Sequence, residues 1–407
     1  MRLLRAIACL LLCVPAAGAV EWVPVGGLSV LGGVHSYAGE SGSLSGNASA
    51  SFSPAMRLSP RWSVLPSAHA EYEGTRRVDD VLGTMTPAAE RLGGRLGIRA
   101  VWANPSSRWR LKPTVSYGRE LSKETKDESW GKGLYDQIRW AVGGEVELLT
   151  REPHSLRMAV DWFESVYPNY TTLESQAALQ FAGQPLAREL VGDRVLDRRG
   201  WQFRLIGDAP LGSRAVGEAS LTGVWSRFAA QRLIDEGGQF QDRAREDFLT
   251  RASFALRMPH EWNADLRARA GVEVAVTANT SNQNGYDATR GRFLPGFYDF
   301  VEWRLEPSVI FVIGPPRRPV SAALKLGRRQ RHYTSRPAQN ETGAYGSGSL
   351  TTTEWSFGTS LDYPMAKRLS LLFSLERTSA SSNQGYQRYY RYAYEATTAL
   401  AGFRWDW

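Results

Sequence analysis

Residues 354–363 read Glu-Trp-Ser-Phe-Gly-Thr-Ser-Leu-Asp-Tyr, so that large and mostly apolar side chains alternate with small or polar ones. An alternation of period two is typical of a β-strand with one apolar and one polar face. The same pattern recurs over residues 137–148, 265–276 and 369–376. Runs of about ten residues suit strands that cross a bilayer with lipid on one side and water on the other.

The connections between these runs fall into two length classes. Short connections rich in Pro, Ser and Gly are predicted at 59–61, 104–107, 151–154, 209–212, 259–261, 315–319 and 364–367, and longer polar ones at 38–43, 73–88, 120–134, 166–199, 227–246, 278–296, 332–352 and 379–390. Short turns that alternate with long loops are typical of the periplasmic and external sides of an outer-membrane barrel. We therefore predict an all-β fold, a transmembrane antiparallel up-and-down β-barrel of about 16 strands (roughly 14–18) with both termini in the periplasm.

The start of the chain predicts export from the cytoplasm. Residues 1–19 combine Arg2 and Arg5 with a short apolar core and small residues at the end, as in a secretory signal peptide. Both cysteines lie in this segment, so we expect neither a disulfide nor a thiolate metal site in the mature protein. Residues 20–407 are predicted to form the barrel, with no separate plug domain because strands begin near Val25. The predicted location is the outer membrane of a Gram-negative cell, reached through the inner membrane.

The last six residues alternate aromatic and polar side chains and end on Trp407. This pattern resembles the terminal strand signature that bacterial outer-membrane β-barrels present to the barrel-assembly machinery. Gly402, Trp405 and Trp407 match that signature, whereas Leu400 departs from it where a polar residue is usual. The resemblance implies the assembly machinery, outer-membrane lipid and lipopolysaccharide as partners. The alternative is an edge strand of a soluble β-protein, but tryptophans gathered near the ends of the runs favour two membrane-interface belts.

Charged side chains are predicted to line the lumen. The alternation assigns to the inner face Arg95, Arg99, Arg110, Lys112, Arg139, Arg251, Arg267, Arg269, Glu273, Arg304, Lys325, Arg329, Arg331, Glu354 and Asp362. In one interpretation, arginine–carboxylate pairs on neighbouring strands brace the wall. In the other, a ladder of guanidinium groups offers weak sites to an anionic solute or polymer. Charge reversal at Lys325 and Arg329 is expected to diminish a weak anion preference.

Two further segments carry patterns of their own. In the longest predicted loop, 166–199, Leu173, Ala177, Ala178 and Phe181 have helical spacing, and this loop either folds into the pore as a constriction or caps it from outside. The sequence Ser-Asn-Gln occurs at 281–283, followed by Asn-Gly-Tyr, and again at 382–384, followed by Gly-Tyr. We interpret this repeat as turn chemistry, with sugar contacts by Tyr286 and Tyr386 as the alternative.

Several classes of function lack support in the sequence. The five histidines show no local catalytic motif, and there is no phosphate-binding or dinucleotide glycine motif and no metal-ligand spacing. The formal net charge of +8 is spread along the chain without the basic runs expected of a nucleic-acid footprint. We therefore predict a protein that is not an enzyme, that needs no cofactor or metal, and that does not bind nucleic acid.

The closing hairpins resemble those of a known group of export barrels. The stretch from Leu361 to Leu371, with the loop and final strand that follow, is similar to the β-barrel part of exopolysaccharide-secretion porins, including the stand-alone myxobacterial type. This resemblance implies passage of a polysaccharide, delivered by a separate periplasmic export protein. The other hypotheses are a passive porin for small anionic solutes and a closed structural or surface-adhesion barrel.

Overall fold

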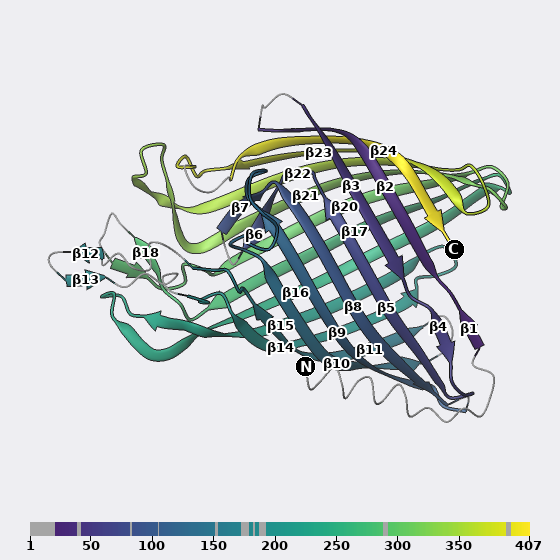
Figure 1. Cartoon of the computed structure of the whole chain (residues 1–407), viewed down its shortest axis with the longest axis horizontal. Helices are drawn as coiled ribbons and strands as arrows, with labels where there is room; N and C mark the ends of the chain where they lie inside the picture. The colour runs from purple at the N-terminus through teal and green to yellow at the C-terminus, as the bar shows by residue number, and fades with distance from the viewer. Residues whose placement is uncertain are drawn as a thin grey trace.

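The computed structural model describes residues 21–38, 42–81, 84–104, 106–150, 154–171, 179–181, 184–186, 193–287, 292–387 and 392–407. They form a closed antiparallel β-barrel of 16 strands with up-and-down topology, which confirms the predicted fold and the resemblance to outer-membrane barrels (Figure 1). No helix long and apolar enough to span a membrane occurs among the described residues. The predicted signal segment, 1–19, lies outside the described residues.

Each strand of the barrel pairs with the next one along the chain, and the last strand pairs with the first. The barrel strands are β2 (Gly26–Tyr37), β3 (Ser43–Phe52), β5 (Trp62–Glu73), β8 (Glu90–Ala103), β9 (Trp109–Lys123), β10 (Gln137–Leu149), β11 (Ser155–Val166), β14 (Arg198–Pro210), β15 (Val216–Ile234), β16 (Phe240–Asn263), β17 (Leu266–Ser281), β20 (Phe300–Ile313), β21 (Val320–Gln339), β22 (Tyr345–Pro364), β23 (Leu369–Ser382) and β24 (Tyr394–Asp406).

Short elements extend the barrel at both ends. The strands β1 (Glu21–Val23) and β4 (Ala55–Arg57) pair with each other at the end where the tight turns and the C-terminus lie. At the opposite end stand three hairpins, formed by β6 (Arg77–Val81) with β7 (Thr84–Ala88), β12 (Leu179–Phe181) with β13 (Gln184–Leu186), and β18 (Gly285–Asp287) with β19 (Arg292–Leu294) (Figure 1). In an outer-membrane barrel these are the periplasmic and external ends respectively.

The alternation of side chains separates an apolar outside from a polar inside. On β22, Trp355, Phe357 and Leu361 are exposed on the outer face, and Trp355 keeps 54% of its surface accessible. The side chains on the opposite, inner face of β22 include Glu354 and Asp362, which form ion pairs with Arg329 and Arg404 on other strands. A band of exposed apolar side chains around a closed sheet fits a bilayer rather than water.

Glycines allow the first and last strands to approach closely where the barrel closes. A Cβ atom on Gly33 would overlap the backbone of Ala399, and one on Gly402 would overlap the carbonyl oxygen of Val30. Leu400 lies between these contacts on the inner face, where it is buried. Gly402 therefore has a packing role in the closed seam, whereas its predicted role in assembly, with Trp405 and Trp407, stays a prediction.

Some predicted connections are wrong. Residues 259–261 belong to β16 and pair with β17, so the turn lies at 264–265 instead. The predicted loops 227–246 and 332–352 are mostly strand, because β15, β16, β21 and β22 continue their pairing beyond the apolar band. Outside a bilayer both faces of a strand meet water, so the hydrophobic alternation that reveals a membrane strand disappears.

The longest predicted loop contains strand where a helix was expected. Residues 179–181 and 184–186 form the antiparallel hairpin of β12 and β13. Its predicted helical positions Leu173, Ala177 and Ala178 lie outside the described residues. Whether this loop constricts the pore stays a prediction.

The repeated Ser-Asn-Gln sequence forms two equivalent sets of side-chain-to-backbone hydrogen bonds, each of which we call a clasp. Asn282 exchanges hydrogen bonds with the backbone of Glu246, and Gln283 reaches on to the backbone of Ile234 and Arg232. In the same way, Asn383 accepts a hydrogen bond from the amide of Thr351 at 2.9 Å and donates one to the carbonyl of Ser349 at 2.9 Å. Gln384 accepts one from the amide of Gln339 at 2.8 Å. The repeat thus ties each long external hairpin to the strand that follows it.

Candidate functional site

Two adjoining cavities occupy the barrel interior. The external cavity, of about 540 Å³, is lined from β8 round to β21, and the periplasmic cavity, of about 900 Å³, is lined by β5 to β14. Glu120, Gln137, Arg139 and Gln202 line both, so the two cavities meet at these side chains. Together they form a polar passage along one wall of the lumen.

Ion pairs between strands account for most of the charged inner face. Lys112 lies 2.6 Å from Glu145, Arg251 lies 2.9 Å from Glu273, and Arg329 lies 2.7 Å from Glu354. Further pairs are Arg110–Glu147, Arg304–Glu306, Lys325–Glu306, Arg331–Glu302 and Arg404–Asp362. Arg304–Glu306 lies within β20 and Arg404–Asp362 joins β24 to β22, whereas the other pairs link neighbouring strands. All of them lower the net charge that these strands present to the lumen.

A second set of arginines on the inner face has no carboxylate partner. Among the described residues, no carboxylate lies within 4.0 Å of Arg95, Arg99, Arg139, Arg198, Arg267 or Arg269. The charges of Arg95 and Arg198 are close enough to Arg139 to repel its own charge. Uncompensated positive charge therefore gathers on the wall formed by β8, β10 and β14.

Three of these arginines lie in one row across the sheet, which we call the arginine row: Arg95, Arg139 and Arg198. Arg95 and Arg139 flank Gly118 in the strand register, and Arg139 and Arg198 flank Ser165. Strands are about 4.8 Å apart, so successive guanidinium groups are spaced by about 10 Å. Because barrel strands tilt, a row perpendicular to them climbs the lumen, here toward the external end.

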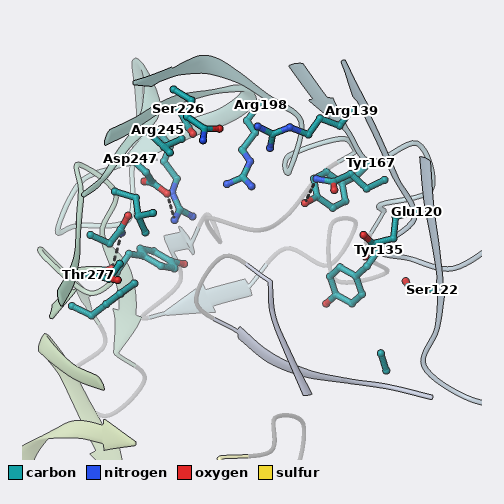
Figure 2. A pocket seen from close by; sticks show the side chains of 18 of the residues that line it. Glu120, Ser122, Tyr135, Arg139, Tyr167, Arg198, Ser226, Arg245, Asp247 and Thr277 are labelled. Atoms are coloured by element: carbon teal, nitrogen blue, oxygen red, sulfur yellow. Dashed lines mark hydrogen bonds and ion pairs between the residues drawn. The ribbon is translucent and has the colours of Figure 1, made fainter. Parts of the chain in front are cut away.

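Two further arginines are held rigidly at the external cavity. The guanidinium of Arg245 lies 4.6 Å from the ring of Phe228 and 4.1 Å from that of Tyr298, and it donates to both carboxylate oxygens of Asp247. Arg331 lies 4.1 Å from the ring of Phe300 and donates to Glu302. Figure 2 shows Arg139, Arg198 and Arg245 along one wall of this cavity.

Aromatic hydroxyl groups face the same cavity. Tyr135, Tyr167 and Tyr298 contribute to its lining, and Tyr167 accepts a hydrogen bond of 2.8 Å from the amide of Gln137 (Figure 2). Burial raises the pKa of the Tyr167 hydroxyl, so this group stays neutral and able to donate. The cavity therefore combines cations with uncharged polar groups, ring faces and the carboxylates of Glu120, Glu124 and Asp247.

One acidic side chain anchors the loop that leads into β10. Asp136 is buried, accepts a hydrogen bond of 2.9 Å from the amide of Ser122, and accepts another from the side-chain amide of Asn169. Burial raises the pKa of the Asp136 carboxyl, although hydrogen bonds from the backbone act in the opposite direction. This side chain braces the external loop and is not among the residues that line the two cavities.

The two ends of the barrel differ in charge. Within the described periplasmic turns, the charged residues are Arg61, Arg108, Arg214, Arg317, Arg318, Lys367 and Arg368 against Asp265. The described external connections, leaving aside the small hairpins, carry Glu124, Asp127, Glu128, Asp136, Asp193, Asp197, Asp235, Glu236, Asp299 and Glu341 against Arg76, Lys126, Lys132 and Arg194. An anion therefore meets a basic rim on the periplasmic side and an acidic one outside.

The register places every predicted lumen residue on the inner face, in two groups. Ten are ion-paired, namely Arg110, Lys112, Arg251, Glu273, Arg304, Lys325, Arg329, Arg331, Glu354 and Asp362. The other five, Arg95, Arg99, Arg139, Arg267 and Arg269, have no such partner within the described part of the chain. That these residues line a conducting path stays a prediction.

Three arginines near the external cavity were not predicted from the sequence: Arg91, Arg198 and Arg245. Arg198 begins β14 and Arg245 lies in the external part of β16, so both fell inside segments predicted as loops. Arg91 lies near the external start of β8 and pairs with Glu120. The charge alternation of residues 243–247, Arg-Ala-Arg-Glu-Asp, gave no apolar face from which a strand could be recognised.

The described residues hold no group of acidic, histidine or cysteine side chains suited to a metal ion. His69 and Glu71 lie on one face of β5, with Nε2 and Oε2 3.3 Å apart, and both side chains are substantially exposed to the lumen.

No model of a known protein family and no curated protein sequence matches the chain. Several solved outer-membrane proteins are similar in structure. A structure described as a bacterial polysaccharide outer membrane secretin has a TM-score of 0.45 at 8% identity, over 94% of this chain and 98% of its own. OccD3 (OpdP) of Pseudomonas aeruginosa has a TM-score of 0.48 at 8% identity, over 97% and 93%. OmpT of Vibrio cholerae has 0.41 at 10%, over 97% and 100%. These similarities concern the barrel architecture alone.

Proposed function

We propose that this chain is an outer-membrane channel that conducts anionic solutes, and that its substrate is an acidic polysaccharide leaving the periplasm. The observation that carries the proposal is the arginine row, Arg95, Arg139 and Arg198, which faces a polar passage without carboxylate partners. Rings and ladders of cations favour anions in a pore. Such passage involves no covalent step, so the proposed protein is not an enzyme.

The spacing of the arginine row suits a polymer better than a single tight site would. Neighbouring guanidinium groups are about 10 Å apart, a distance close to the screening length at physiological ionic strength. A polymer with charges along its length contacts the next arginine before it leaves the previous one, so the free-energy barrier for each step is small. Conduction needs contacts strong enough to admit the solute and weak enough to release it.

The asymmetry of the two ends supports export. A basic periplasmic rim raises the local concentration of a polyanion at the entrance, and acidic external connections oppose its return. The same rim offers a surface to an acidic periplasmic export protein that would deliver the polymer.

Reconstitution in planar bilayers tests the channel itself. The purified full chain is expected to give stable conductance steps with a reversal potential that indicates anion preference. A preference for cations would contradict the role of the arginine row, and absence of conductance would favour the closed structural or surface-adhesion barrel.

Deletion of the gene, followed by measurement of secreted polysaccharide, tests the substrate. Loss of secretion, restored by the wild-type chain, is expected. Unchanged secretion in a strain whose purified protein conducts anions would reject the export function and favour a passive porin for small anionic solutes.

A further inference from the structure

One arginine near the external end, Arg328, points away from the lumen and lies beside two tryptophans. Arg328 lies on β21 in register with Leu305 and Trp355, which are both exposed on the outer face of the barrel. Its chain neighbours on the opposite face are Gly327 and Arg329, and the latter pairs with Glu354 inside. Arg328 therefore does not belong to the lumen described above.

Two indole rings hold this guanidinium on the outer surface. Its central carbon lies 5.0 Å from the ring of Trp303 and 4.9 Å from the ring of Trp355. The Nε atom is buried between them and has no hydrogen-bond partner. Among the described residues, no carboxylate or other acceptor satisfies the terminal nitrogens of Arg328 either. Rings on both sides orient the planar group without neutralising its charge.

The depth of Arg328 follows from its neighbours on the same face of β21. Ala322, Leu324 and Leu326 precede it toward the periplasm, and Gln330 and His332 follow it toward the outside. The change from apolar to polar side chains marks the external edge of the apolar band, where tryptophans of the interface belt are expected. A charge at this level meets lipid headgroups rather than hydrocarbon.

We propose that Arg328, Trp303 and Trp355 form a binding site for a phosphate group of lipopolysaccharide in the outer leaflet. A phosphate offers paired oxygens that match the geometry of a guanidinium, and it supplies the acceptors that the protein does not. The indole rings exclude water from one edge of the contact and fix its direction. This site is independent of conduction, since it lies on the opposite face of the sheet from the lumen.

Arg377 on β23 provides the matched comparison. It also lies on the outer face near the external edge of the band, in register with Phe357, but its guanidinium pairs with Glu395 at 3.3 Å and is largely exposed. Its charge is thus already compensated by the protein. Substitution of Arg377 removes the same formal charge as substitution of Arg328, but from a guanidinium that already has a carboxylate partner.

The test measures binding of purified lipopolysaccharide to the full-length chain in neutral detergent, for the wild type, Arg328→Gln and Arg377→Gln. Each protein is titrated with native and with enzymatically dephosphorylated lipopolysaccharide, and inorganic phosphate serves as the free anion. Arg328→Gln is expected to weaken binding of native lipopolysaccharide about tenfold, as loss of one charge-assisted hydrogen-bonded contact would. Arg377→Gln is expected to change it less than twofold.

Dephosphorylation separates this site from a general loss of packing. The wild type is expected to bind dephosphorylated lipopolysaccharide as weakly as Arg328→Gln does, and the substitution is expected to have no further effect on that ligand. Equal weakening with both ligands would overturn the proposal, as would unchanged binding in Arg328→Gln. Loss of a dimer or trimer in Arg328→Gln, with unaltered lipid affinity, would assign the residue to a subunit contact instead. Heat-modifiability on gels checks that each variant is folded.

Discussion

Removal of the arginine row gives the most direct test of the proposed selectivity. We consider Arg95→Gln, Arg139→Gln and Arg198→Gln combined. An anion beside Arg139 lies about 7 Å from that guanidinium and about 12 Å from the other two, given spacings of about 10 Å along the row. In water at physiological ionic strength these three charges together stabilise the anion by about 0.4 kcal/mol and disfavour a cation equally. The triple variant is therefore expected to lower the anion-to-cation permeability ratio about fourfold.

The assay is the reversal potential across a planar bilayer under a potassium chloride gradient. The control is the double variant Arg251→Gln with Glu273→Gln, which removes an ion pair of 2.9 Å and leaves the net charge of the lumen unchanged. This control is expected to retain the wild-type ratio. In salt of about 1 M the screening length falls to about 3 Å, so the wild type and the triple variant are expected to converge. A fourfold difference that persists in high salt, or an equal loss in the control, would refute the electrostatic reasoning.

Three further predictions concern the fold around the lumen. Gly402→Ala is expected to lower barrel stability by about 1–3 kcal/mol in urea titration because the new methyl overlaps the neighbouring strand, whereas Gly32→Ala, whose Cβ meets nothing within 4 Å, is expected to be neutral. Asn383→Ala is expected to raise amide exchange in the β21–β22 hairpin about tenfold while leaving the global urea midpoint unchanged, since it removes one clasp. Burial raises the pKa of Asp136, so its contribution to stability is present in acid and is lost as pH rises through the folded pKa; Asp136→Asn, which keeps an acceptor for the Ser122 amide, is expected to abolish that dependence in pH-resolved urea titrations.

The fold is predictable from the sequence because every second side chain of a membrane strand faces lipid and must be apolar. Residues 354–363 display that rule fully, and the strand β22 contains them. The rule ends where the bilayer ends, which is why the external parts of β15 and β16 were predicted as loop. The clasp at Asn282 shows what replaces lipid there: polar side chains secure the hairpin by bonding to the backbone of neighbouring strands.

The lumen is predictable only in part. The alternation along a strand tells which side chains point inward, and the strand register places the predicted residues on the inner face. The alternation does not tell which carboxylate stands opposite which arginine. The run at Lys325, Arg329 and Arg331, expected to affect conduction, is ion-paired throughout. Most of the unpaired charge lies instead on β8, β10 and β14, with Arg267 and Arg269 on β17, and no local feature of the sequence distinguishes these arginines from those opposite a carboxylate.

Gly118 is the position where an added carboxylate would lie within the arginine row. In the register it stands between Arg95 and Arg139, and the nearest atom to a Cβ built there is the carbonyl oxygen of Gly94 at 3.7 Å, an ordinary contact. Gly118→Asp therefore places a carboxylate between two unpaired arginines without a steric cost. If anion preference depends only on whether a carboxylate lies opposite each arginine in the strand register, Gly118→Asp is expected to lower anion preference without loss of barrel stability. Reduced preference together with unfolding would instead mean that Gly118 is retained for packing, and unchanged preference would mean that anions do not pass along the arginine row.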